Sequence, residues 1–171
     1  MALVKGTNCY VNLNEADSYF EDRLDASAWQ TASDTIREQA LVTATAVLEE
    51  KEWLGISITE DQALAFPRSG SFVDPSRGYR QVFDNSYAFP STDEVEATLP
   101  RDIRLLRRSC YELAYHLLNN EGLTDSTGTV ESLKVGPIEL TEVRNASTTP
   151  SVVNTLIYPM IRSSNRYWRG W

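Results

Sequence analysis

Apolar residues recur every three or four positions in the first third of the chain, a spacing typical of amphipathic helices. The first predicted helix follows Asn14, taken as its N-cap, and its apolar face contains Ala16, Tyr19, Phe20 and Leu24. The second follows Ser33 and ends near Lys51, and its apolar face contains Ile36, Ala40, Ala44, Val47 and Leu48. Trp29 lies between the two, where we expect it to fill the space between them.

The longest apolar pattern runs from about Pro100 to Asn120 and predicts the central helix of the fold. Its apolar positions are Ile103, Leu105, Leu106, Cys110, Leu113, Ala114, Leu117 and Leu118. This arc is broad enough to contact neighbours on several sides, as a central helix does. A fourth, short helix is predicted to begin at Pro150 and to stop near Pro159.

Three segments break the helical period. Residues 130–143 read as a β-hairpin around Gly136 and Pro137. Thr59 with Gln62 has the spacing of a capping box and predicts a short turn of helix. Residues 68–97 form a long polar and aromatic loop, which is either functional or contains small strands.

Together these patterns predict a mainly α fold. We expect a small bundle of three to four helices around a long central helix, with a β-hairpin, a long loop and an extended C-terminal arm. The predicted domain covers residues 1–157 and includes hairpin 130–143 and loop 68–97, and the predicted arm covers residues 158–171.

Composition agrees with one soluble domain of 171 residues, 42% of them hydrophobic. The sequence has no apolar run of the roughly 18 residues that a membrane span needs, so we expect no membrane partner. Its first residues lack the pattern of a signal peptide, which predicts a chain that is neither secreted nor processed. The two cysteines, Cys9 and Cys110, lie far apart in sequence, and we expect reduced thiols.

Charge is distributed unevenly along the chain, whose net charge is −8. Residues 1–143 carry 12 basic and 24 acidic residues, whereas residues 144–171 carry four arginines and no acidic residue. An acidic body repels nucleic-acid phosphates, while the basic C-terminal segment is able to dock on an acidic partner.

Catalytic patterns are missing from the sequence, which predicts a protein that is not an enzyme and binds no cofactor or metal. His116 is the only histidine and falls within the central apolar helix, so the serines have no evident base. No phosphate-binding glycine loop occurs. The acidic clusters Asp17–Asp25 and Asp93–Glu96 allow an acid–base pair or a Mg²⁺ site to be drawn, but a solvated acidic face is the interpretation that we favour.

Two groups of residues rise above this background. The first is an arginine ridge near the start of the central helix, formed by Arg101, Arg104, Arg107 and Arg108. Cations at a helix N-terminus oppose the helix dipole, so an acidic group is expected nearby. That group is either within this chain, such as Asp102 or the 93–96 run, or on a neighbouring subunit or DNA.

The second group is the C-terminal arm, where aromatic and apolar residues alternate with arginines. We predict that it binds a partner through Tyr158, Met160, Ile161, Arg162, Arg166, Tyr167, Trp168, Arg169 and Trp171. Arginine, tyrosine and tryptophan are enriched in interface hot spots. The arm would insert into another protein, fold back on its own domain, or stack on the bases of single-stranded nucleic acid.

Several strings in this sequence resemble a known family. They are TNCYVNLNEADSYFEDR, WQTASDTIREQALVTATAVLEE, W-L-G, TEDQALAFPRSG, LPRDIRLLRRSCYELAYHLL and SLKVGPIEL, and the most specific runs from Asp61 to Gly70. Over most of residues 8–157 the chain is similar to the head–tail connector proteins of tailed bacteriophages, which act as adaptor or head-completion proteins. Members of the same sequence group are also labelled DnaT-like single-stranded-DNA-binding proteins.

The resemblance implies a structural virion protein that forms a ring, usually a dodecamer, below the portal. Such a ring joins the capsid vertex to tail or nozzle proteins and lets genomic DNA pass without specific binding. The protein would be made in the host cytoplasm and reside at the head–tail interface of the virion. The arginine ridge and an acidic set would then form opposite faces of one subunit interface, the acidic set being Asp17, Glu21, Asp22 and Asp25. The alternative is a replication accessory protein that binds single-stranded DNA.

Overall fold

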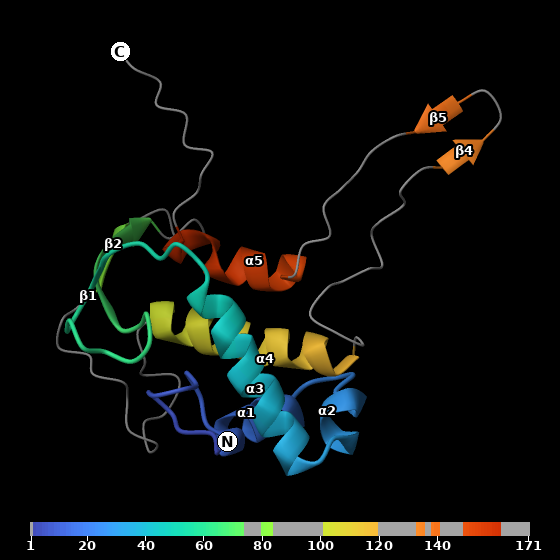
Figure 1. Ribbon diagram of the computed structural model, residues 1–171, viewed down its shortest axis with the longest axis horizontal. Helices are drawn as coiled ribbons and strands as arrows, with labels where there is room; N and C mark the ends of the chain where they lie inside the picture. The colour runs from blue at the N-terminus through green and yellow to red at the C-terminus, as the bar shows by residue number, and fades with distance from the viewer. Residues whose placement is uncertain are drawn as a thin grey trace.

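The computed structural model describes residues 2–73, 80–83, 101–119, 133–135, 138–140 and 149–161 and is mainly helical (Figure 1). Its α-helices are α1 (Leu13–Glu21), α2 (Ser27–Thr31), α3 (Asp34–Glu49), α4 (Arg101–Asn119) and α5 (Ser151–Ile157). The predicted fold class, a small helical bundle with a hairpin, is confirmed.

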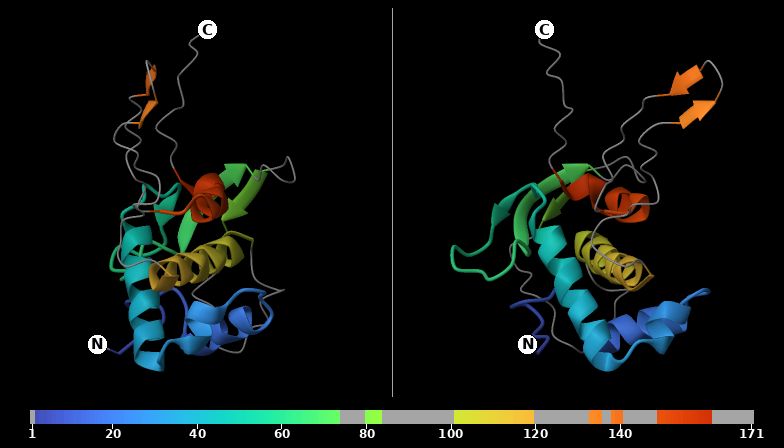
Figure 2. Two further views of the ribbon diagram at one scale, coloured as in Figure 1. Left: turned by 90° about the vertical axis from the view of Figure 1, so that its right-hand side faces the viewer. Right: turned by 45° about the vertical axis from the view of Figure 1, so that its right-hand side comes forward.

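Helix α4 is the centre of the bundle, as its broad apolar arc predicted. It lies between α5 on one side and α1 with α2 on the other, while α3 crosses it (Figures 1 and 2). Leu106, Cys110, Leu113 and Ala114 are each at most 1% exposed. None of the helices in the described part of the chain is long and apolar enough to cross a membrane.

Helix α1 begins two residues earlier than the sequence pattern suggested. Asn12, not Asn14, is the N-cap: its side chain accepts a hydrogen bond from the Glu15 amide at 2.8 Å, and the Glu15 carboxylate accepts one from the Asn12 amide at 2.9 Å. This reciprocal pair is a capping box. The helix also ends at Glu21, so Leu24 lies beyond it and is 92% exposed instead of facing the core.

Replacing Asn12 with alanine is expected to lower the free energy of unfolding by about 1 kcal/mol, because the first turn of α1 loses its cap. Urea unfolding of N12A measures this loss. The matched control is N14A, which removes an exposed asparagine from inside the same turn and should cost less than about 0.5 kcal/mol. A larger loss in N14A than in N12A would contradict the observed cap.

Helix α3 begins after Ser33, as predicted, and contributes Ala40, Ala44 and Leu48 to the core. Ile36 was expected on this face but is 49% exposed. The buried Thr45 hydroxyl lies 3.4 Å from the Cys9 sulfur and 3.5 Å from the Cys110 sulfur.

Both cysteines are free and buried. Although they lie far apart in sequence, Cys9 in the segment before α1 and Cys110 on α4 both lie at the Thr45 hydroxyl of α3. A hydrogen bond with Cys110 lowers the pKa of the Cys9 thiol to about 7, and that bond together with burial raises the pKa of Cys110. This thiol pair therefore belongs to the packing of the core.

An antiparallel sheet covers one end of the bundle, in the order β1 (Ile56–Ser57), β2 (Arg68–Val73) and β3 (Arg80–Phe83). Strands β2 and β3 confirm that the predicted loop 68–97 contains small strands. Its other residues, 74–79 and 84–97, lie outside the described part of the chain. At the entry to β1, Gly55 has φ 82°, and a Cβ there would lie 2.5 Å from the Ser69 carbonyl oxygen.

The segment between β1 and β2 contains no helix, so the predicted helical turn is wrong. Of the predicted capping box, only the hydrogen bond from the Thr59 amide to the Gln62 side chain is formed. The Gln62 side chain accepts hydrogen bonds from the Ile58 and Thr59 amides and donates one to the Leu64 carbonyl. The Arg68 guanidinium donates to the carbonyls of Leu54, Gly55 and Ala65. Gln62 and Arg68, both within the string from Asp61 to Gly70, thus fix the conformation of this loop.

Strands β4 (Leu133–Val135) and β5 (Ile138–Leu140) pair antiparallel and confirm the predicted hairpin. Helix α5 begins after Pro150, as predicted, and continues into a 3₁₀ helix, η2 (Tyr158–Met160).

The packed domain extends past the predicted boundary at residue 157. Met160 is fully buried, and its carbonyl accepts a hydrogen bond from the Leu54 amide at 2.8 Å. Ile161 forms an antiparallel bridge with Trp53. Met160 and Ile161 therefore belong to the domain, and the arm predicted to begin at Tyr158 begins after Ile161 at the earliest.

Candidate functional site

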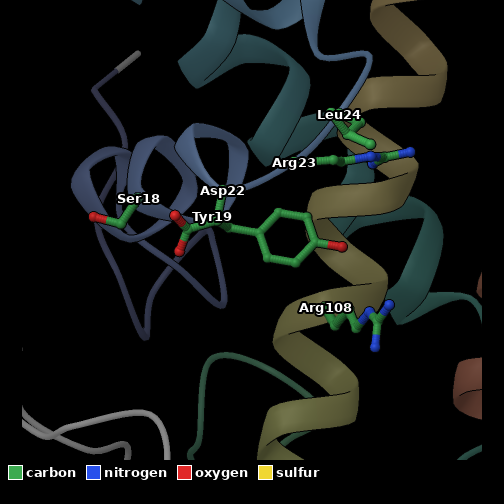
Figure 3. Close-up of a pocket in the computed structure, with 6 residues that line it drawn as sticks. All are labelled: Ser18, Tyr19, Asp22, Arg23, Leu24 and Arg108. Atoms are coloured by element: carbon green, nitrogen blue, oxygen red, sulfur yellow. The ribbon is translucent and has the colours of Figure 1, made fainter.

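The main candidate site is a surface pocket between the C-terminal half of α1 and the middle of α4, called here the α1–α4 pocket. Its volume is about 630 Å³, and its lining residues are Ser18, Tyr19, Asp22, Arg23, Leu24 and Arg108. That volume lies within the usual range of ligand pockets, roughly 300–1,000 Å³. Figure 3 shows the Tyr19 ring reaching from α1 to α4, with Arg23 and Arg108 on either side of its hydroxyl group.

A buried carboxylate anchors this arrangement. Glu112 on α4 is 7% exposed and accepts hydrogen bonds from the Tyr19 hydroxyl at 2.5 Å and from the Arg23 guanidinium at 2.7 Å. The charge of Glu112 is therefore paired, as a buried carboxylate requires. Because both donors come from α1 or its C-terminal end, Glu112 fixes that end of α1 against α4.

Aromatic rings complete the contact between α1 and α4. The Tyr19 ring stacks on Tyr111, with 4.9 Å between centroids, and the Arg23 guanidinium lies 4.6 Å from the centroid of Tyr115. The Tyr115 hydroxyl donates to the Asp25 carbonyl oxygen at 2.5 Å. These contacts leave Arg23 positioned at the pocket with part of its guanidinium in solvent.

Tyr19 remains a neutral phenol over the physiological pH range. Burial and the neighbouring Glu112 carboxylate raise the pKa of its hydroxyl, although Arg108 opposes this shift. Since its single proton is donated to Glu112, Tyr19 offers only an acceptor to other groups. The hydrogen-bond donors available in the α1–α4 pocket therefore come mainly from the two arginines.

The arginine ridge does not form one surface. Arg107 was predicted at a subunit interface, but it is 2% exposed and pairs with Glu15 at 3.2 Å inside the same chain. Glu15 also binds Lys5 at 2.6 Å. Arg101 and Arg104 are partly exposed, and Arg108 is exposed.

Asp102, one of the acidic partners expected for the arginine ridge, does not pair with it. Burial raises the pKa of Asp102, and the backbone amides of Asp102 and Ile103 partly offset the shift by hydrogen bonding to its carboxylate. No ion pair joins Asp102 to the ridge among the described residues. The other expected partner, the 93–96 run, lies outside the described residues.

The acidic set is likewise divided. Asp17 accepts hydrogen bonds from the Trp29 indole at 2.8 Å and from Arg37 at 2.6 Å, so it is a structural residue. Glu21, Asp22 and Asp25 are exposed. Asp22 and Arg108 line the same pocket of one chain, and the subunit interface predicted for these residues stays a prediction.

A second, smaller pocket of about 280 Å³ lies beside Asp17 and Arg37. Its lining residues are Asp17, Phe20, Glu21, Trp29, Gln30 and Arg37. The Arg37 guanidinium is held by the carboxylates of Asp17 and Asp34. The charges of Asp17 and Arg37 are thus already paired within the chain, and the remaining charged group of this pocket is the exposed carboxylate of Glu21.

Of the predicted arm residues, the structure describes only the first part. Tyr158 is 60% exposed, whereas Met160 is buried in the core. Arg162, Arg166, Tyr167, Trp168, Arg169 and Trp171 lie outside the described residues, and their partner-binding role stays a prediction.

Sequence analysis missed the group that builds the α1–α4 pocket, namely Glu112, Arg23 and Tyr19. One signal was present: Arg108, Tyr111, Glu112 and Tyr115 are spaced three or four residues apart on α4 and share one side of the helix.

His116 lies in the last turn of α4 and is partly exposed. In the described parts of the chain, no three histidine, cysteine or acidic side chains gather to hold a metal ion.

Comparison with known proteins gives one match. A family model described as "Putative DnaT-like ssDNA binding protein" matches residues 2–170, which is nearly the whole chain. No curated protein matches this sequence, and no solved structure matches it.

Proposed function

Because this chain belongs to the family of DnaT-like single-stranded-DNA-binding proteins, we propose that it binds single-stranded DNA. The observation that carries the proposal is the family match over residues 2–170. It favours the reading that sequence analysis held as the alternative. Head–tail connector identity, in contrast, receives no support from the comparisons.

The C-terminal segment supplies suitable chemistry for this function. Residues 162–171 contain three arginines and three aromatic residues and no acidic residue. Aromatic rings stack on the bases of a single strand, and arginines contact its phosphates. The exposed ring of Tyr158 lies four residues before this segment.

The acidic body limits the electrostatic part of binding. With 24 acidic and 12 basic residues in positions 1–143, long-range repulsion opposes the approach of DNA. Affinity must then depend on local contacts, above all on base stacking in the C-terminal segment. A single strand with exposed bases is therefore the expected ligand, and duplex DNA is not.

Removing the three rings of the segment is expected to weaken DNA binding by at least about tenfold, since stacking contributes roughly 1–3 kcal/mol per base. The variant is Y167A/W168A/W171A, measured by fluorescence anisotropy with a labelled oligothymidine. The matched control, Y167F/W168F/W171F, keeps the rings and should bind nearly as the unaltered chain does. Equal affinity of the alanine variant and the unaltered chain would exclude stacking by this segment.

A second candidate function, a head–tail adaptor ring in a virion, is favoured by the acidic charge of residues 1–143. An acidic channel lets DNA pass without retaining it. Such a ring would contact a portal protein and tail proteins. Mass photometry of the anisotropy samples separates the candidates: rings that form without DNA and ignore the oligonucleotide would support the adaptor and overturn the first proposal.

A further inference from the structure

We infer that the α1–α4 pocket is a subsite for one backbone phosphate of the DNA strand, bound by Arg108 with help from Arg23. This inference rests on the single-stranded-DNA binding proposed above and names a place on the folded domain where the strand lies. The α1–α4 pocket would then be a second region of DNA contact, apart from the C-terminal segment.

The two guanidinium groups face the same space. Arg23 extends from the C-terminal end of α1 and Arg108 from the middle of α4, and the Tyr19 hydroxyl lies between them (Figure 3). A guanidinium has five N–H donors in a planar fork, a geometry that matches the oxygens of a phosphate. Two such groups at one pocket therefore suit an anion with several oxygens.

Arg108 is the group with unused charge. Its side chain is exposed, and it forms no ion pair with the carboxylates in the described ranges. The group it contacts is the neutral Tyr19 hydroxyl, which accepts a hydrogen bond but carries no negative charge. A phosphate at this point would gain a charge-assisted hydrogen bond without breaking an existing salt bridge.

Arg23 has a different role because one of its amino groups is bound to Glu112. That ion pair neutralises the buried carboxylate and holds the guanidinium at the edge of the pocket, where its side chain is 29% exposed. The remaining N–H groups of Arg23 are then able to point towards a bound phosphate. Glu112 accordingly acts as a positioning residue and does not touch the ligand.

Three other arginines of the domain lack this combination of charge and access. Arg107 is buried with Glu15, and Arg37 is held between Asp17 and Asp34. Arg68 donates to three backbone carbonyls. Within the described part of the chain, Arg108 and Arg23 thus form the pair of arginines that line a pocket open to solvent.

Asp22 allows a test in which DNA binding is expected to become tighter instead of weaker. Its carboxylate lines the same pocket and is exposed, so it repels a phosphate bound there. Leu24, 92% exposed at the pocket, offers an apolar side chain against which a sugar or base is able to pack. Removing the charge of Asp22 should therefore tighten DNA binding, whereas removing the charge of Arg108 should weaken it.

The experiment measures the affinity of the full chain for labelled oligothymidine by fluorescence anisotropy between 0.1 and 1 M NaCl. For R108Q we expect a roughly fivefold higher Kd at 0.1 M salt, because each phosphate contact on a single strand contributes about 0.7 to the salt slope. The slope itself should fall by about 0.7. For D22N we expect a Kd lower by about twofold at 0.1 M salt.

The matched control is R104Q, which removes the same charge from the same helix at a residue that does not line the pocket. Arg104 is partly exposed and lies one helical turn from Arg108, so its charge acts on a bound phosphate only through space. Its loss should therefore raise the Kd by no more than about twofold, less than the loss of Arg108 does. Circular dichroism melting of all three variants confirms that they are folded, which is expected because none removes a described ion pair.

The outcomes separate the subsite from the function. If the unaltered chain binds the oligonucleotide but R108Q and D22N do so equally well, the subsite is wrong and the proposed function stands. If R104Q and R108Q weaken binding to the same extent, the effect is one of net charge and the subsite is again wrong. If the unaltered chain does not bind the oligonucleotide at all, the proposed function fails and the subsite with it.

Discussion

Replacing Met160 with alanine is expected to lower the free energy of unfolding by about 3 kcal/mol, because a fully buried side chain is removed from the core. Met160 lies in the same hydrophobic cluster as Trp53, Val153 and Ile157. Its backbone carbonyl is already held by the Leu54 amide. The backbone at residue 160 is therefore unable to shift far to close the cavity that the substitution leaves.

Urea unfolding followed by circular dichroism measures this effect. The matched control is Y158A, two residues away in the same 3₁₀ helix but 60% exposed, and it should change stability by less than about 0.5 kcal/mol. Equal, small effects of both substitutions would place residues 158–161 outside the packed domain, as their sequence alone suggested.

The sequence pattern predicted best where contacts are local and periodic. The breadth of the apolar arc of α4 identified the central helix, and its described bounds, Arg101–Asn119, lie within the predicted range of about 100–120. The hairpin around Gly136 and Pro137 was identified in the same way, from turn residues between short apolar runs. Such features depend on neighbours within a few positions.

Two errors were avoidable from the sequence. Asn12 and Glu15 have the spacing of a capping box, which distinguishes Asn12 from Asn14 as the N-cap of α1. Arg107 follows Ile103 by four residues, so helical geometry places it on the buried face of α4 and not with Arg104 and Arg108. Reading the four arginines as one ridge ignored the 100° turn per residue.

Other features depend on contacts between distant segments, which no local pattern contains. Met160 is buried because the chain around Trp53 and Leu54 pairs with it, more than 100 positions away in sequence. The carboxylate of Glu112 is paired by Tyr19 and Arg23, about 90 positions away. The α1–α4 pocket therefore becomes visible only once the two helices are placed side by side.

The largest loss of stability is expected on replacing Trp29 with alanine, about 4 kcal/mol. Trp29 is 2% exposed and stacks on Phe20 with 4.5 Å between ring centroids. Phe20 in turn contacts the ring of Tyr115 on α4. Removing the indole leaves a large cavity where α1 and α2 pack against the central helix.

A matched variant, W29F, separates ring packing from hydrogen bonding. It keeps an aromatic ring against Phe20 but loses the indole N–H that donates to Asp17 at 2.8 Å. We expect a loss of only about 1 kcal/mol, because Arg37 still pairs with the Asp17 carboxylate. Urea unfolding of both variants provides the comparison, and an equal loss in the two would assign the stabilisation to the hydrogen bond instead of the rings.

The same substitution links stability to the candidate site. Tyr19 and Arg23 lie on either side of Phe20, so the packing of Phe20 against Trp29 also sets where these two side chains meet Glu112. If the α1–α4 pocket binds a phosphate, W29A should raise the Kd for oligothymidine even at temperatures where the variant is fully folded, and W29F should not. Unchanged affinity of folded W29A would show that the position of α1 does not control the pocket.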